Sequence, residues 1–443
     1  MPRTFASHLS HWRLACTAVL PAFLCIGICS LAVFSPLPAR AERGNPQVQI
    51  DGKSIDELIA AYMKEHDVSG LTLAIVQAPY ITRVVGYGVV DREVKLLAAS
   101  RTMFSIGRMT EAYTAVAIMQ LAETGKLGLD DPIGKFLKNI PEAWKGVPVR
   151  ALLLHSSGLP DYSLPPDFDP GNNTPADKLI SSVASAPLVF PTGTKIKACA
   201  TDHLLLQLLV EATSGGSYQA FVRANQFDRL GLKNTFFASE LGKIPREWPR
   251  KDEKHSKFLQ EPQLINPTEF VTGYRGSGST LTSIAPPDPN GLVLPRAAGI
   301  YTSAEDISVW DIGLAGNILI KDINLRNLLY TPQKLQDGTE VPTSGPWQFP
   351  GRKGLMYTGG SELGCTSFLS RYTDAQELLC VTLLANKEGL DFAPLATKIA
   401  GAFDARLVVT TAPPAEPAPA PAVPAATSAP TTNAQPKKEE KKK

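Results

Sequence analysis

The chain has 443 residues, of which 44% are hydrophobic and 19% are charged, and its formal net charge at pH 7 is +2. This composition is ordinary for a globular protein and supplies enough apolar material for a large core, so one large domain or two lobes that share a site are expected. The small net charge, with basic residues scattered except at the very end, excludes the strong positive field that nucleic-acid binding requires.

Residues 1–41 have the pattern of a secretory signal peptide. Arginines precede an apolar run over residues 14–34, and the small residues that end at Ala41 fit a cleavage site. The alternative is an uncleaved anchor helix, because the run approaches the roughly 20 residues that span a bilayer. Prolines after the run favour cleavage near Ala41, which predicts a secreted or periplasmic protein with no stable membrane span.

The cysteines and histidines do not form the pattern of a disulfide framework or a metal site. Cleavage after Ala41 leaves Cys199, Cys365 and Cys380, which permit at most one bridge. The sequence leaves open which of them, if any, are paired. Because there is no CxxC motif and no histidine cluster, we expect neither a metal nor another cofactor.

The first expected elements are a helix and a hairpin. Apolar residues recur at helical spacing over 54–66. Segments 71–76 and 83–90 then have the composition of strands and are separated by a turn.

Helices should dominate the middle of the chain. Segment 108–124 is apolar nearly all round, which predicts a buried helix, and Gly125 is a suitable stop for it. Further helices are expected where Asp131-Pro132 provides a start signal, at 202–213 and at 303–314.

Two strands, 366–371 and 377–384, are expected near the end of the domain. Strands at both ends with helices between them predict an α/β (α+β) fold, in which an antiparallel sheet is flanked by helices and a mainly helical lobe is inserted. We expect this domain to span 47–409. Residues 410–443 are rich in Ala and Pro and end in lysines and glutamates, so they should form a disordered tail, either simply solvated or a spacer toward an envelope surface.

Three sequence blocks carry a family resemblance. Segment 104–132 contains FSIGRMT, TAVAIMQL, GKL and LDDP, segment 152–162 is LLLHSSGLPDY, and segment 297–306 is AAGIYTSAED. In this order they resemble the SxxK block, the LLTHTSGLP loop and the AAGGLxSTAxD block of the β-lactamase-related serine hydrolases, which include class C β-lactamases, penicillin-binding proteins and DD-peptidases. The resemblance extends over about residues 54–403 and implies a serine β-lactamase-like fold.

The SxxK motif of that superfamily is degenerate in this chain. In the motif a serine at a helix start presents its hydroxyl, and a lysine one turn later helps to remove the proton. Arg108 and Glu111 occupy these two positions. A guanidinium cannot be acylated and keeps its proton, so the covalent step has no acceptor. In subtilisin, loss of the nucleophile lowers the rate on the order of a million-fold.

The second motif should supply Tyr and Asn, but it is occupied by Ala198, Cys199 and Ala200. Neither alanine can transfer a proton or bind a substrate amide. Cys199 lies between them, where the family pattern has no attacking group, and a lone cysteine is more often core filler than a nucleophile.

The third motif, KTG or HTG in the family, is Tyr357-Thr358-Gly359-Gly360. Its backbone is preserved, and the resemblance implies that one strand N–H of an oxyanion hole is preserved with it. The cationic or imidazole side chain is absent. Tyr357 is either a general acid or base or, as we favour, an aromatic residue packed on the strand.

Two alternatives for catalysis are weaker. Ser105 precedes Arg108 by three residues, but a shift of about one turn, about 5 Å, would misalign any oxyanion donor. His155, Ser156 and Ser157 resemble a base beside two nucleophiles, yet they lie in the LLTHTSGLP-like loop, where a structural turn is expected.

Arg108 and Glu111 permit two interpretations. A guanidinium at a helix start is a natural anion site, which suggests a carboxylate-bearing ligand such as a cell-wall peptide terminus. Alternatively, the two side chains form an i,i+3 ion pair with each other.

The sequence therefore predicts an exported, catalytically inactive β-lactamase-like protein that binds a small molecule or a cell-wall peptide, or acts as a scaffold. The alternatives are an active esterase or peptidase with a non-standard nucleophile, and a structural envelope protein. The predicted ligand-binding residues are Arg108, Glu111, Tyr357, Thr358, Gly359 and Gly360.

Overall fold

The structure is a computed structural model that describes residues 53–93, 95–166, 168, 174–243, 270–284, 299–374 and 378–407. The predicted signal peptide, the predicted tail and both limits of the 47–409 domain lie outside these residues, as do the first two residues of the AAGIYTSAED block. Within the described residues, no helix is long and apolar enough to cross a membrane.

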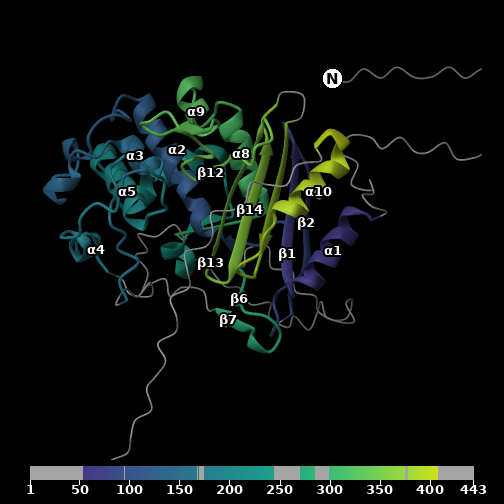
Figure 1. Cartoon of the computed structure of the whole chain (residues 1–443). Helices are drawn as coiled ribbons and strands as arrows, with labels where there is room; N and C mark the ends of the chain where they lie inside the picture. Colours follow the sequence, from purple (N-terminus) through teal and green to yellow (C-terminus); the bar gives the residue numbers. More distant parts are fainter. Residues whose placement is uncertain are drawn as a thin grey trace, which may run out of the picture. The chain divides into compact units, whose positions relative to one another are not determined.

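An antiparallel sheet lies at the centre of the fold (Figure 1), and the described residues contribute eight strands to it. The expected N-terminal hairpin pairs directly with the last strand, so that the two ends of the domain meet in the sheet. Across this junction Leu73 lies opposite Leu383. In spatial order the strands are β11 (Thr343–Ser344), β12 (Trp347–Gln348), β13 (Leu355–Glu362), β14 (Cys365–Tyr372), β15 (Leu379–Ala385), β1 (Gly70–Gln77), β2 (Tyr80–Asp91) and β3 (Leu96–Leu97).

Helices α1 (Ile55–Glu65) and α10 (Ala393–Phe403) cover one face of the sheet (Figure 1). The Ser54 hydroxyl accepts a hydrogen bond from the Glu57 N–H, which defines the start of α1 as the sequence predicts. Side chains alternate along a strand, so Leu73 of β1 packs toward these helices whereas its neighbour Ala74 joins the core on the other face.

The other face is covered by α8 (Ala304–Ala315), and α2 (Thr110–Glu123) packs against α8 in the same core. Both helices were predicted from their apolar composition. Tyr113 of α2 stacks on Trp310 of α8, with ring centroids 4.3 Å apart. A 3₁₀ turn, η1 (Gly107–Met109), precedes α2 and carries Arg108.

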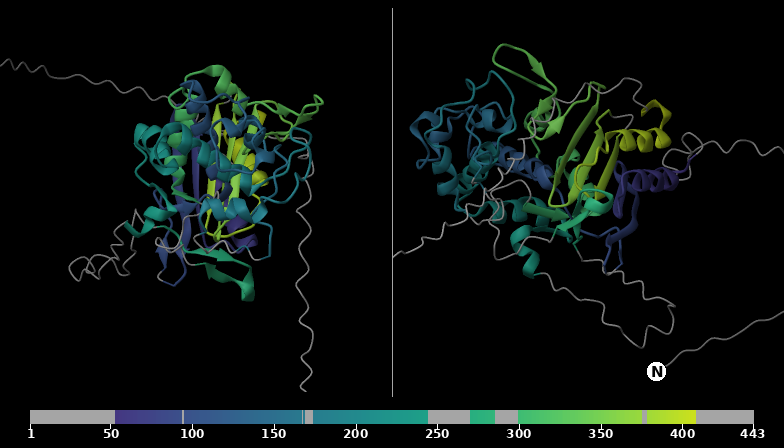
Figure 2. Two further views of the ribbon diagram at one scale, coloured as in Figure 1. Left: turned by 90° about the vertical axis from the view of Figure 1, so that its left-hand side faces the viewer. Right: turned by 60° about the horizontal axis from the view of Figure 1, so that its bottom comes forward.

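A mainly helical lobe lies beside the sheet, as Figure 1 and the right view of Figure 2 show. The helix predicted to begin at Asp131-Pro132 is wrong, because Pro132 has an extended backbone and only the 3₁₀ turn η2 (Ile133–Lys135) follows. The helices of this lobe are α3 (Val149–Leu153), α4 (Ala176–Val183), α5 (Ala200–Ser214), α6 (Tyr218–Val222) and α7 (Asp228–Leu230), and α9 (Ile323–Leu329) follows α8.

Several short strands complete the fold. A small sheet has the order β4 (Phe104–Ser105), β8 (Ile300–Thr302), β5 (Thr235–Phe237), and two hairpins are formed by β6 (Gly273–Arg275) with β7 (Thr282–Ile284) and by β9 (Gln333–Lys334) with β10 (Glu340–Val341). Pairing of β4 with β8 fixes the segment that leads into η1 and α2.

A buried ion pair joins the sheet to α8. Arg371 of β14 donates from Nε to the Asp311 carboxylate of α8 at 2.7 Å, and both side chains are buried. Cys199, Cys365 and Cys380 are free thiols and are also buried, so no disulfide links these three residues.

Candidate functional site

A cleft of about 180 Å³ lies where η1, the start of α5 and the end of β13 meet. The positions of the SxxK motif and of the second motif, far apart in the sequence, come together here. The residues that line the cleft are Arg108, Glu111, Asp161, Ser163, Ala198, Cys199, Ala200, His203 and Glu362.

The Thr-Gly-Gly backbone of β13 packs against the backbone of the turn that carries Arg108. A Cβ atom on Gly360 would lie 2.4 Å from the Arg108 backbone N and 2.6 Å from the Ile106 carbonyl oxygen, so this approach requires glycine. Ser367 of β14 reinforces the contact, because its hydroxyl donates to the Ile106 carbonyl at 2.8 Å. The end of the strand is therefore held against η1, the turn that carries Arg108.

The side chains of the third motif do not line this cleft. The Tyr357 ring lies 5.1 Å from the Phe368 ring and packs with the core under α1 and α10. Thr358 is buried. Of the residues predicted to bind a ligand, Arg108 and Glu111 line the cleft, and Gly360 contributes through its close backbone contact with Arg108.

Arg108 and Glu111 are paired with each other. Arg108 Nε donates to Glu111 Oε1 at 3.3 Å, with the Arg108 side chain 45% exposed and that of Glu111 only 11% exposed. The coulombic attraction of Glu111 raises the pKa of Arg108 against the opposing effect of burial. This geometry is that of the i,i+3 self-pair.

The pair continues into the protein through His155 and Asp202. His155 Nε2 lies 3.2 Å from Glu111 Oε2, and His155 Nδ1 lies 3.1 Å from Asp202 Oδ2. Asp202 also accepts a hydrogen bond from the Ser157 hydroxyl. The four charged side chains form a continuous chain from the cleft into the core.

Burial and charge act in opposite directions on His155. Burial lowers the pKa of His155, but the carboxylates of Glu111 and Asp202 raise it by more, so that the pKa is about 9. Burial raises the pKa of Glu111, but His155 and Arg108 lower it well below its usual range. At neutral pH His155 is thus a cation whose two N–H groups donate to carboxylates, and it has no lone pair with which to act as a base.

His203 at the cleft wall is instead neutral, because burial lowers its pKa to about 4. Its Nε2 lies 2.8 Å from the Thr114 hydroxyl, which in turn lies 2.7 Å from the Tyr218 hydroxyl. Nδ1 of His203 has no hydrogen-bond partner among the described residues.

The candidate nucleophiles Cys199, Ser105 and Ser157 are buried. Burial raises the pKa of Cys199, so it is a thiol at neutral pH. Ser105 is buried on β4 opposite Tyr301 and does not line the cleft. Ser157 is buried and bonds to Asp202. His155 and Ser157 thus belong to the packed loop that the sequence predicts.

A protein-family model also matches this chain. The model described as Beta-lactamase matches residues 55–402. The chain belongs to the beta-lactamase family. The sequence resemblance to this family is thereby confirmed.

Characterised relatives of this beta-lactamase family member are distant in sequence. Protein flp of Staphylococcus aureus (strain MW2) is 23% identical over 262 residues, which are 58% of this chain and 48% of flp. Penicillin-binding protein 4* of Bacillus subtilis (strain 168) is 23% identical over 352 residues, covering 76% of this chain and 72% of the relative. The chain thus spans about half the length of the flp relatives.

Solved structures share the fold. An octameric penicillin-binding protein homologue from Pyrococcus abyssi has a TM-score of 0.62 at 21% identity, covering 80% of this chain and 76% of that chain. FmtA from Staphylococcus aureus has a TM-score of 0.61 at 19% identity, and the match covers 83% of this chain and 92% of the FmtA chain. A class C beta-lactamase has a TM-score of 0.61 at 16% identity, and the match covers 78% of this chain and 94% of the beta-lactamase chain. The predicted fold class is confirmed.

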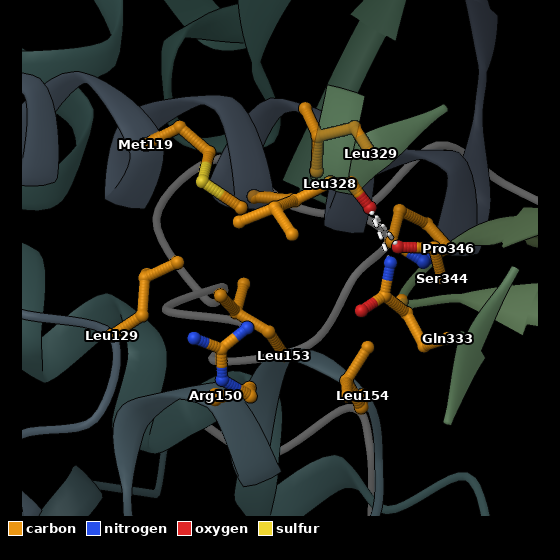
Figure 3. Close-up of a pocket in the computed structure, with 12 residues that line it drawn as sticks. Met119, Leu129, Arg150, Leu153, Leu154, Leu328, Leu329, Gln333, Ser344 and Pro346 are labelled. Carbon is orange, nitrogen blue, oxygen red and sulfur yellow. Dashed lines mark hydrogen bonds between the residues drawn. The ribbon is translucent and has the colours of Figure 1, made fainter. Parts of the chain in front are cut away.

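A second cavity is lined by residues of α2, α3 and α9 (Figure 3). Five leucines and Met119 form half of its lining, and the Ser344 hydroxyl donates to the Leu328 carbonyl at 2.6 Å. Its volume of about 20 Å³ accommodates a single water molecule. The larger cleft is therefore the candidate site.

Proposed function

We propose that the protein is a catalytically inactive member of the beta-lactamase family that is exported and uses its cleft to bind a ligand. The observation that carries this proposal is the chain Arg108–Glu111–His155–Asp202, in which the nucleophile and base positions hold each other in ion pairs. A hydrolase of this family needs a hydroxyl and a free base at those positions. Neither is available.

The cleft remains open although its catalytic groups are replaced. It contains about 180 Å³, enough for a fragment of a small molecule or of a cell-wall peptide. Export is supported by the signal-like pattern of residues 1–41. In this account the protein acts by binding or as a scaffold in the cell envelope.

Turnover of a chromogenic ester tests the loss of catalysis. We expect no hydrolysis by the wild type above the rate with heat-denatured protein. Hydrolysis that disappears in Ser105→Ala or Cys199→Ala would instead identify a non-standard nucleophile and establish an active esterase. An Arg108→Ser, Glu111→Lys double variant reports whether restoring the motif side chains restores activity.

A further inference from the structure

The charges that line the cleft are mainly negative. Glu111, Asp161 and Glu362 contribute three carboxylates, whereas Arg108 contributes one guanidinium. His203 is neutral. The lining therefore carries a net charge of −2 at neutral pH, which repels an anion that enters the cleft.

Arg108 is already surrounded by these carboxylates. It donates to Glu111, and Glu362 and Asp161 also stabilise its charged form. Its attraction for a further carboxylate is thus largely cancelled. The structure does not favour a carboxylate-bearing ligand at this arginine.

His203 supplies an independent sign of a missing partner. The side chain is 2% exposed and lines the cleft, yet its Nδ1 has no hydrogen-bond partner among the described residues. The Thr114 hydroxyl can donate to the Thr110 carbonyl at 3.4 Å and accept from His203 Nε2–H. In that tautomer Nδ1 is an acceptor, and a buried unpaired acceptor is satisfied by a donor that a ligand brings.

An apolar surface adjoins the acidic cleft. Asp161, Ala198 and Cys199 also line a neighbouring hollow of about 20 Å³, which Lys197 lines as well and whose rim includes Leu164, 66% exposed, and Val189, 54% exposed. A ligand that reaches the carboxylates can thus bury an apolar chain on this rim.

We propose that the cleft binds a primary ammonium group carried on an apolar chain, with the ammonium between Asp161, Glu362 and His203 and the chain against Leu164 and Val189. The inference rests on the proposed function, because it assumes that the cleft binds without reaction. A free alkylamine and a lysine side chain of a peptide share this chemistry.

Calorimetric titration of the full chain with matched probes tests this assignment. The probes are n-hexylammonium, Nα-acetyl-lysine amide and hexanoate at equal ionic strength. We expect hexylammonium to bind at least tenfold more tightly than hexanoate, and Glu362→Gln to weaken it about tenfold. Asp161→Asn, with folding checked by thermal unfolding, provides a second variant. Asp177→Asn on α4 is the matched control, because Asp177 does not line the cleft, and it should leave binding unchanged.

The two amine probes distinguish the sources of the ligand. Binding of hexylammonium alone indicates a small amine, and binding of the acetyl-lysine amide indicates a peptide. Tighter binding of hexanoate, no binding of either amine, or binding unaffected by both carboxylate variants would overturn the inference. Tighter binding of hexanoate would contradict the ammonium ligand but not the proposal that the protein binds without catalysis. Covalent labelling by a penicillin would contradict that proposed function, whichever probe binds.

Discussion

Nε2 of His155 lies 3.2 Å from Oε2 of Glu111, and both side chains are shielded from solvent. Glu111 thereby lies between two cations, His155 on one side and Arg108 on the other. Glu111 is thus the centre of a buried ion-pair chain, and removing one of its members would leave a buried charge uncompensated.

Removing the charge of Glu111 should therefore destabilise the protein. Glu111→Gln leaves the buried His155 cation with one carboxylate partner fewer, and removal of one member of a buried pair costs about 3 kcal/mol. The measurement is the free energy of unfolding in urea at pH 7. The matched control is Glu142→Gln, whose side chain is 87% exposed and paired with Lys145. An exposed pair contributes at most about 1 kcal/mol, and equal losses in both variants would contradict the buried chain.

The stability of the protein should fall on the alkaline side of neutrality. His155 has a folded-state pKa of about 9 against an ordinary value of 6.5. Between these two values the folded protein keeps a proton that the unfolded chain releases, so the free energy of unfolding decreases as pH rises through this window. Urea unfolding at intervals from pH 6 to pH 10 measures the effect. His155→Gln should flatten this part of the profile, and an unchanged slope would show that another group titrates.

The arrangement of the helices and strands could be predicted largely from local patterns. Apolar composition over a helical length indicated α2 and α8, and the strands at both ends predicted that both ends of the domain contribute to the sheet. The helix at Asp131-Pro132 was wrong because the start signal is followed by a chain reversal in which Pro132 pairs with Pro148. A cap residue and a proline do not specify how far a helix continues.

The candidate site was only partly accessible from the sequence. Arg108 and Glu111 are three residues apart, so their pairing follows from helix geometry. His155 is 44 residues from Glu111 and 47 residues from Asp202, and only the tertiary fold brings these groups together. His155 lies in the segment LLLHSSGLPDY and Asp202 in the segment ACATDH. No pattern in the sequence indicates that these two segments are in contact.

The close approach of β13 to η1 predicts a strict requirement for glycine at position 360. In Gly360→Ala the new Cβ atom would lie 2.4 Å from the Arg108 backbone N, so strand and turn must separate. We expect a loss of about 1–3 kcal/mol in the free energy of unfolding and weaker ligand binding. Gly146→Ala is the control, because a Cβ atom there meets nothing within 4 Å. Full stability of Gly360→Ala would show that the contact is not tight.

The buried Arg371–Asp311 pair predicts a large stability effect far from the cleft. Arg371→Ala leaves the Asp311 carboxylate, which is 0% exposed, without its cation, at a cost of about 4 kcal/mol. Thermal and urea unfolding measure this loss. Arg101→Ala removes an arginine that is 57% exposed in its pair with Glu305, and little change is expected. A small effect of Arg371→Ala would mean that water enters the core beside Asp311.

Labelling with a fluorescent penicillin shows whether the family's covalent chemistry is absent from this protein. The purified wild type and the Arg108→Ser, Glu111→Lys double variant are incubated with the probe, separated under denaturing conditions and compared with an active penicillin-binding protein. The account predicts no fluorescent band for the wild type. A stoichiometric covalent adduct on the wild type would reveal a working nucleophile and contradict it.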